Sequence, residues 1–102
     1  MANQDEEGRM FDLPYEIRLE SPISWGKGET RDTITVQRSL KAKDFKGIKA
    51  NEIVMDDMLK MVSRITGEPQ ALIEELEARD LFKVIEVVNS FLPSGLVTGG
   101  SR

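Results

Sequence analysis

Apolar and polar side chains alternate strictly from residue 15 to residue 20. Tyr15, Ile17 and Leu19 fall on one side of this stretch, and charged residues fall on the other. Such alternation is the period of a β-strand with one buried and one solvated face. The pair Ser21-Pro22 follows directly, and we expect it to end the strand.

The same alternation resumes across residues 32–38, where Ile34 and Val36 point inward and the residues between them are polar. Residues 25–28, which lie between the two stretches, are Trp-Gly-Lys-Gly, and glycine adopts positive φ without steric penalty. Two alternating runs joined by a glycine turn predict a β-hairpin. Because an isolated hairpin is only marginally stable in water, helices must cover its apolar face.

Later in the chain the apolar period lengthens toward 3.6 residues, which is typical of amphipathic helices. A short helical turn is expected around residues 43–46. The next helix is expected to be capped by Asn51 or Asp56 and to end at Thr66-Gly67, with glycine just past its end. The apolar stripe predicted for this helix consists of Met55, Met58, Leu59, Val62 and Ile65.

Two further helices are predicted. Pro69 is expected in the first turn of the shorter one, where its missing N–H leaves no hydrogen bond unmade. Asp80 is expected at the start of the other, where an acid interacts favourably with the free N–H groups and the helix dipole. Pro93 is expected to stop this last helix, which is the most apolar one and contains Leu81, Phe82, Val84, Ile85, Val88, Phe91 and Leu92.

The pattern therefore predicts an α+β fold in which an N-terminal β-hairpin is followed by about three helices in a single small domain. A length of 102 residues fits one domain, which is expected to span residues 15–92. Residues 1–14 lack periodicity and carry four acids against one base, so we expect a disordered acidic arm there. Residues 93–102 are rich in glycine and are expected to form a flexible tail.

The composition argues against most enzymatic chemistry. The chain has no cysteine and no histidine, so thiolate sites and the commonest proton-transfer side chain are missing, and Ser63 has no histidine base. Gly26 and Gly28 do not match a phosphate-binding loop. We therefore expect no catalytic, cofactor-binding or metal-binding residues. The carboxylate clusters on predicted helices do not suggest a metal site, because adjacent acids on a helix point about 100° apart; they are Asp56, Asp57, Glu74, Glu75 and Glu77.

The hydropathy pattern predicts a soluble cytoplasmic protein that does not contact a membrane. No apolar run approaches the ~20 residues needed to cross a bilayer. The N-terminus is acidic and lacks the apolar segment of a secretory signal. Hydrophobic residues make up 39% of the chain and charged residues 31%, which is ordinary for a globular protein.

Charge is distributed unevenly along the chain. Residues 15–50 contain eight bases and five acids, whereas residues 51–92 contain four bases and nine acids. Internal pairing and head-to-tail association of copies both explain this distribution. A nucleic-acid-binding domain is an alternative function because five bases cluster around Phe45, although a pI near 4.9 argues against it. A generic protein-interaction adaptor domain is a further alternative. The clustered bases are Arg38, Lys41, Lys43, Lys46 and Lys49.

Four stretches carry the joints between the predicted elements. Residues 15–28, YEIRLESPISWGKG, form the opening strand and its turn. Residues 36–45, VQRSLKAKDF, form a strand that ends in arginine with an aspartate shortly after it. Residues 63–69, SRITGEP, form a helix end. The fourth is a pattern across the last two helices, made by Leu76, Asp80, Leu81, Phe91 and Leu92.

Together these stretches resemble the tail assembly chaperone family of Mu-like and P2-like bacteriophages and prophages. The chain departs from the family pattern at Ser39-Leu40, where members often have proline. The resemblance implies a non-catalytic chaperone that binds the phage tape measure protein and assists tail tube assembly. It also implies action in the host bacterial cytoplasm, no cofactor, and no place in the finished virion. Copies of the chain itself are a further candidate partner.

A helical partner of this kind presents apolar stripes, so flexible thioethers and aromatic rings are the candidate contacts. Met61 lies off the predicted stripe and is expected to be exposed. Met58 either contacts the partner or fills a gap in the core, and Trp25 either contacts the partner or folds back over the hairpin. The candidate partner contacts are Trp25, Met58, Met61 and Phe91.

Overall fold

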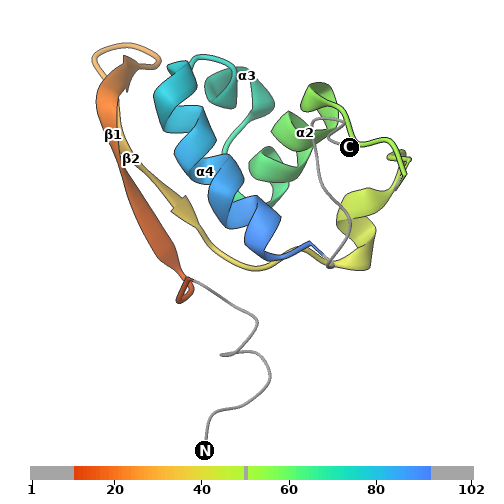
Figure 1. Cartoon of the computed structure of the whole chain (residues 1–102). Helices are drawn as coiled ribbons and strands as arrows, with labels where there is room; N and C mark the ends of the chain where they lie inside the picture. Colours follow the sequence, from red (N-terminus) through yellow and green to blue (C-terminus); the bar gives the residue numbers. More distant parts are fainter. Residues whose placement is uncertain (1–10, 50, 93–102) are drawn as a thin grey trace, which may run out of the picture.

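The computed structural model describes residues 11–49 and 51–92 and contains an antiparallel β-hairpin followed by helices (Figure 1). The hairpin consists of β1 (Tyr15–Ser24) and β2 (Thr30–Val36). The helical elements are the short 3-10 helix η1 (Ala42–Phe45) and the α-helices α2 (Met55–Thr66), α3 (Gln70–Ile73) and α4 (Ala78–Ser90). The predicted α+β class, with an N-terminal hairpin and about three helices, is confirmed.

The strand β1 runs past the point at which the sequence pattern predicted its end. Its pairing with β2 is regular as far as Arg18 opposite Thr33 and resumes at Ile23 opposite Arg31. The residues of β1 between these pairs outnumber those of β2, so they form a bulge. Pro22 lies in this bulge, where no ladder hydrogen bond is required of it, and it does not end the strand as predicted.

The hairpin turn has the glycine geometry that the sequence predicts. Gly26 and Gly28 both have φ of +72°, a backbone conformation that other residues rarely adopt. The Trp25 N–H donates to the Glu29 carbonyl at 3.0 Å and closes the turn. The predicted inward side chain of Ile34 is fully buried beneath the helices.

Asp80 of α4 holds the bulge of β1 in place. Its two carboxylate oxygens accept the backbone N–H groups of Glu20 at 2.9 Å and Ser21 at 3.0 Å. Two donors that the bulge removes from strand pairing are therefore satisfied by a side chain. The helix itself begins at Ala78, two residues before the predicted start. The carboxylate of Asp80 thus binds the strand, which the sequence pattern did not reveal.

The helix α2 begins without either of the predicted caps. Val54 precedes its first residue, and the Asp57 carboxylate accepts the Val54 N–H at 3.1 Å. Asn51 lies ahead of the helix start and Asp56 lies within the first turn, so both predicted caps are wrong. The predicted end is confirmed, because Gly67 follows the helix with φ of +77°.

The buried stripe of α2 includes Met61, contrary to the expectation that this side chain is exposed. Met58, Met61 and Ile65 follow one another at spacings of three and four residues, which places them on one helix face. Met61 is 0% exposed and Met58 is buried beside it, so Met58 fills the core. Met55 is 46% exposed in the first turn, so its assignment to the stripe is also wrong.

The core lies between one face of the hairpin and the helices that cover it, α4 over β1 and α2 over β2 (Figure 1). Phe11 and Leu13 pack half-buried against this core, and Asp12 and Pro14 beside them are exposed, whereas residues 1–10 of the predicted acidic arm and the predicted tail lie outside the described residues. None of the helices in the described ranges is long and apolar enough to cross a membrane. The buried apolar residues are Ile17, Leu19, Ile23, Ile34, Val36, Ile53, Met58, Met61, Val62, Ile65, Leu72, Ile73, Leu76, Val84, Ile85, Val87 and Val88.

Candidate functional site

The arginine that follows β2 forms a two-pronged ion pair with the aspartate of η1. Arg38 donates to the two carboxylate oxygens of Asp44 at 2.7 and 2.9 Å, and the Lys41 N–H donates to the same carboxylate at 2.7 Å. Asp44 is buried, yet its hydrogen bonds with Arg38 hold the pKa of its carboxyl below the usual value. The pair therefore keeps its charges and fixes η1 beside the end of β2.

Arg64, in the last turn of α2, joins the same junction. Its guanidinium donates to the Asp44 carbonyl at 2.5 Å, and its own carbonyl accepts from Arg38 at 3.4 Å. One residue further along, the Ile65 carbonyl accepts the Gln37 N–H at 2.8 Å. These bonds connect the end of β2, η1 and the end of α2.

The corner between α2 and α3 is closed by its own polar side chains. The Ser63 hydroxyl donates to the Glu68 carbonyl at 2.6 Å, and the Thr66 hydroxyl donates to the Val62 carbonyl at the same distance. The Glu68 carboxylate accepts from Arg31 at 2.5 Å, which ties this corner to β2. Each polar residue of the corner thus has a structural partner.

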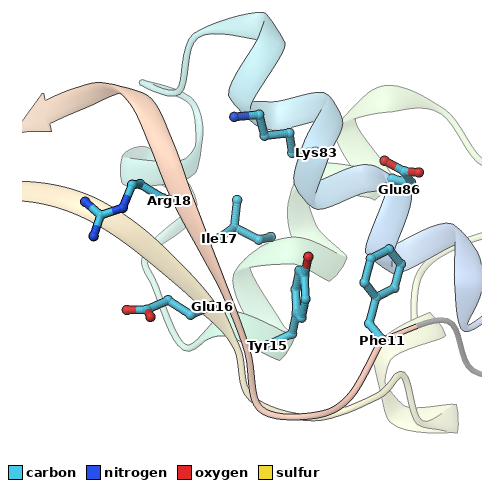
Figure 2. A pocket seen from close by; sticks show the side chains of 7 residues that line it. All are labelled: Phe11, Tyr15, Glu16, Ile17, Arg18, Lys83 and Glu86. Atoms are coloured by element: carbon cyan, nitrogen blue, oxygen red, sulfur yellow. The ribbon is translucent and has the colours of Figure 1, made fainter.

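A pocket of about 240 Å³ opens between β1 and α4, and Figure 2 shows the side chains that line it. The rings of Phe11 and Tyr15 lie beside one another with their centroids 4.7 Å apart. Ile17 is the buried apolar residue of the pocket. We call it the aromatic pocket; it is lined by Phe11, Tyr15, Glu16, Ile17, Arg18, Lys83 and Glu86.

The helix α4 contributes Lys83 and Glu86 to the rim of the aromatic pocket. The Lys83 ammonium lies 3.0 Å from a Glu20 carboxylate oxygen and 3.6 Å from one of Asp80. The hydrogen bond to Glu20 raises the pKa of Lys83, so this ammonium stays charged at neutral pH. Glu86 is exposed and forms no ion pair with a residue of the described ranges. The α4 side of the rim therefore presents a paired base and an acid with no ion pair in the described ranges, and β1 adds the charged side chains of Glu16 and Arg18.

The family of this chain follows from comparison with models of known protein families. The chain matches the family model for phage tail assembly chaperone proteins, E, or 41 or 14, over residues 16–93. It belongs to this family. The protein therefore has a tail assembly chaperone role, and the resemblance predicted from the sequence is confirmed. No curated protein and no solved structure matches the chain.

The stretches on which the resemblance rests are the joints of this chaperone. Arg38 and Asp44 pair with each other, the corner at residues 63–69 is closed by its own hydrogen bonds, and Asp80 binds the bulge of β1. At Ser39-Leu40, where the sequence departs from the expected pattern, the Ser39 carbonyl accepts from Arg38 at 3.0 Å. These residues hold the elements of this chain together, so their side chains are engaged within the fold.

The four predicted partner contacts do not come together on one surface. Trp25 lies half-buried at the hairpin turn and packs against the core, as expected of a side chain that folds back. Phe91 lies half-buried just past the end of α4. Met58 and Met61 are buried. As folded, the two methionines present no surface to a partner, because both belong to the core face of α2.

The aromatic pocket was missed by the sequence analysis for a specific reason. Phe11 falls in the stretch without periodicity that was assigned to the arm, yet its ring packs beside Tyr15.

Phe82, which is 57% exposed, was counted with the apolar residues of α4, although it lies off the face that carries Val84 and Val88. A helix makes one turn in about 3.6 residues. Counting from Val84 and Val88 therefore places Phe82 on a different face of α4, which is how the sequence could have identified it as exposed.

The buried polar side chains of the described ranges are engaged within the fold. Within residues 11–49 and 51–92, no group of three or more acidic side chains is arranged to hold a metal ion. In the same part of the chain every buried side-chain nitrogen and oxygen has a hydrogen-bond partner. The aromatic pocket, with two part-buried rings and a charged rim, is a hollow in which a side chain of another protein could be received.

Proposed function

We propose that the protein binds the phage tape measure protein and assists tail tube assembly without remaining in the virion. Membership of the tail assembly chaperone family supports the assembly role. The aromatic pocket supports direct contact with an apolar helix face, because the part-buried rings of Phe11 and Tyr15 offer apolar surface beside α4. In this proposal the protein acts in the host bacterial cytoplasm and catalyses no reaction.

The size of the aromatic pocket suits a contact that must later be released. A volume of about 240 Å³ accommodates one or two apolar side chains of a partner. Burial of one such side chain contributes about 1.5–3 kcal/mol, whereas bringing two proteins together costs at least about 4 kcal/mol. One copy of the chaperone would therefore bind weakly, and several copies along a long partner would protect it while remaining displaceable by tube subunits.

Trp25 and Phe91 remain proposed contacts outside the aromatic pocket. Each is half-buried, so part of each ring is available at the surface. Met58 and Met61 are not part of the proposal, because a partner could reach them only after the core had opened. Self-association is also proposed, and Val54 and Met55 support it as adjacent side chains that are each about half exposed. Sedimentation equilibrium of the purified chain tests this part.

Co-expression with overlapping fragments of a candidate tape measure protein tests the main proposal. We expect the chaperone to increase the soluble fraction of at least one fragment and to be retained with it on an affinity column. The variant Phe11→Glu places a charge among the pocket rings and should abolish this effect. The matched control is Phe82→Glu, which changes an exposed ring of α4 that does not line the pocket.

Circular dichroism of both variants shows whether the fold is retained. If no fragment gains solubility with the unmodified chaperone, tape measure binding is wrong. If Phe82→Glu abolishes the effect and Phe11→Glu does not, binding occurs elsewhere than in the aromatic pocket. Mass spectrometry of purified virions tests the final step, and detection of the chaperone in stoichiometric amount would contradict its release.

A further inference from the structure

A second and more open groove lies where η1 meets the last turn of α2. It has a volume of about 510 Å³ and is lined by four bases and one acid. The acid is the buried Asp44, which is already paired with Arg38. The groove therefore carries an excess of positive charge. We call it the basic groove; its lining residues are Arg38, Lys43, Asp44, Lys46 and Arg64.

The two arginines of the basic groove are explained by the fold. Arg38 donates to both carboxylate oxygens of Asp44 and to the carbonyls of Ser39 and Arg64. Arg64 donates to the Asp44 carbonyl. Removal of either arginine would leave acceptors at the junction of β2, η1 and α2 without their donors. Their positive charges remain fixed beside the groove.

The two lysines of the basic groove are not explained by the fold. Lys43 and Lys46 are exposed, and neither side chain forms a hydrogen bond or an ion pair with any residue in the two described ranges. Lys41 and Lys49 flank them, are exposed, and likewise have no ion pair within that part of the chain. Because like charges in close proximity repel one another, we expect this cluster to lower the stability of the folded chain.

Internal pairing neutralises little of this charge. In the described part of the chain, Arg31 with Glu68 is the ion pair that joins a base of the basic first half to an acid of the acidic second half. Two further ion pairs join an acid of the first half, Glu20, to bases of the second half, Arg79 and Lys83, so they do not neutralise the excess bases of the first half. Within residues 11–49 and 51–92, internal pairing between the two halves therefore accounts for little of the uneven charge.

We propose that the basic groove binds a short helical segment of another protein whose acidic residues recur at three- and four-residue spacings. Such spacing places several carboxylates on one helix face, so they can enter the groove together. Lys43 and Lys46 would form ion pairs with the carboxylates of the partner. Arg38 and Arg64, which the fold holds in place, would add positive charge that attracts these carboxylates. This inference goes beyond the proposed function and does not depend on the identity of the tape measure protein.

Two other occupants suit the groove less well. An extended nucleic acid would pass from the groove onto a surface of a chain with net charge −4, which repels the remaining phosphates. A second copy of the chain would offer scattered exposed acids, of which the largest cluster along the described sequence is Glu74, Glu75 and Glu77. These acids lie where α3 turns into α4 and do not share one helix face, so few could enter together.

Titration of the full-length protein with synthetic peptides tests this inference. The probe is a helical peptide of about 15 residues with glutamate at alternating three- and four-residue spacings, and its control has glutamine at those positions. In ¹⁵N-labelled protein we expect amide shifts at residues 43–46 and 64 with the glutamate peptide only. Fluorescence anisotropy measures the affinity at low salt, and added salt should weaken it.

The variant pair for this test is matched in charge. Lys43→Gln with Lys46→Gln lowers the net charge by two, and Lys27→Glu at the distant hairpin turn lowers it by the same amount. We expect the first to weaken peptide binding by about 5- to 10-fold and the second to change it less than about twofold. Retained circular dichroism spectra show that both variants are folded.

Four results of the peptide experiments would overturn the inference. They are equal binding of the glutamine peptide, equal loss in Lys27→Glu, amide shifts confined to other residues, and tighter binding of a single-stranded oligonucleotide than of the glutamate peptide. A loss of self-association in the double lysine variant, without peptide binding by the unmodified protein, would assign the groove to a second copy and contradict the proposal. Tape measure solubility is a separate measurement, so either proposal can fail alone.

Discussion

Asp80 accepts the backbone N–H of Glu20 at 2.9 Å, although 60 positions separate the two residues in the sequence. The neighbouring N–H of Ser21 reaches the other oxygen of the same carboxylate at 3.0 Å. The side chain of Asp80 is 0% exposed, and Lys83 lies 3.6 Å from it. A buried charge with these partners joins α4 to the irregular part of β1 and helps to position the wall of the aromatic pocket.

The first prediction is that Asp80→Ala strongly destabilises the protein. The substitution leaves two backbone donors without an acceptor in a part-buried position, and each such donor costs about 1–3 kcal/mol. We expect a loss of about 2–4 kcal/mol in the free energy of unfolding, measured by urea denaturation. Glu75→Ala, which removes an exposed carboxylate, should change this free energy by less than about 0.5 kcal/mol. Equal effects would contradict the bridging role of Asp80.

The second prediction concerns Arg38 and pH. The folded-state pKa of Asp44 lies below its unfolded value because Arg38 donates to its carboxylate. A depressed carboxyl pKa contributes stability above the unfolded pKa of about 4, and this contribution is lost as pH falls through the folded pKa. Arg38→Gln should therefore cost about 3 kcal/mol at neutral pH and clearly less in acid.

Urea denaturation of Arg38→Gln and of the unmodified chain at neutral pH and below pH 4 measures this difference. Lys27→Gln removes an exposed base from the hairpin turn and serves as the control, with little effect at either pH. A difference between Arg38→Gln and the unmodified chain that stays constant with pH would show that the Asp44 carboxylate is not the group stabilised by Arg38.

The third prediction compares two methionines of α2. Met61 is fully buried, so Met61→Ala leaves a cavity and should lower the free energy of unfolding by about 2–5 kcal/mol. Met55 is largely at the surface, and Met55→Ala should change it by less than about 0.5 kcal/mol. Thermal or urea denaturation of the two variants distinguishes this buried face from the one that the sequence pattern predicted, for which the order of the effects is reversed.

The fourth prediction isolates the backbone at the end of α2. A Cβ added to Gly67 would meet no atom within 4 Å, so Gly67→Ala changes only the strain of a residue held at φ of +77°. We expect a loss of about 1–2 kcal/mol in the free energy of unfolding. Gly67→Asn should lose less, because asparagine tolerates this conformation better. Equal losses in both variants would indicate a steric cause instead.

Sequence periodicity predicted the elements of this fold because each element buries one face. Alternation identified Ile17 and Ile34 as inward, and the glycine after residue 66 marked the end of α2. Errors arose where side chains take over backbone hydrogen bonds. Pro22 was taken as a strand end because the acceptor that permits the bulge, Asp80, comes from a distant helix.

The candidate sites were harder to predict because each combines residues that lie far apart in the sequence. The aromatic pocket combines Phe11, from a stretch without periodicity, with side chains of α4. The basic groove combines η1 with the end of α2, and only the fold brings Arg64 to the lysines that the sequence already grouped. Composition could identify the cluster of bases, whereas the division between structural arginines and unpaired lysines required the three-dimensional contacts.

The last prediction follows from that division. Lys43→Gln with Lys46→Gln removes two mutually repelling charges that form no described side-chain contact, so it should raise the free energy of unfolding by a few tenths of a kcal/mol at low salt, about 0.2–0.5 kcal/mol. Added salt screens the repulsion and should erase this gain. Arg38→Gln, in the same groove, should have the opposite sign because it leaves a buried carboxylate unpaired. Urea denaturation at two salt concentrations measures both effects. Destabilisation by the lysine substitutions at low salt would contradict this prediction. It would mean that the two side chains stabilise the fold and are not free to bind a partner.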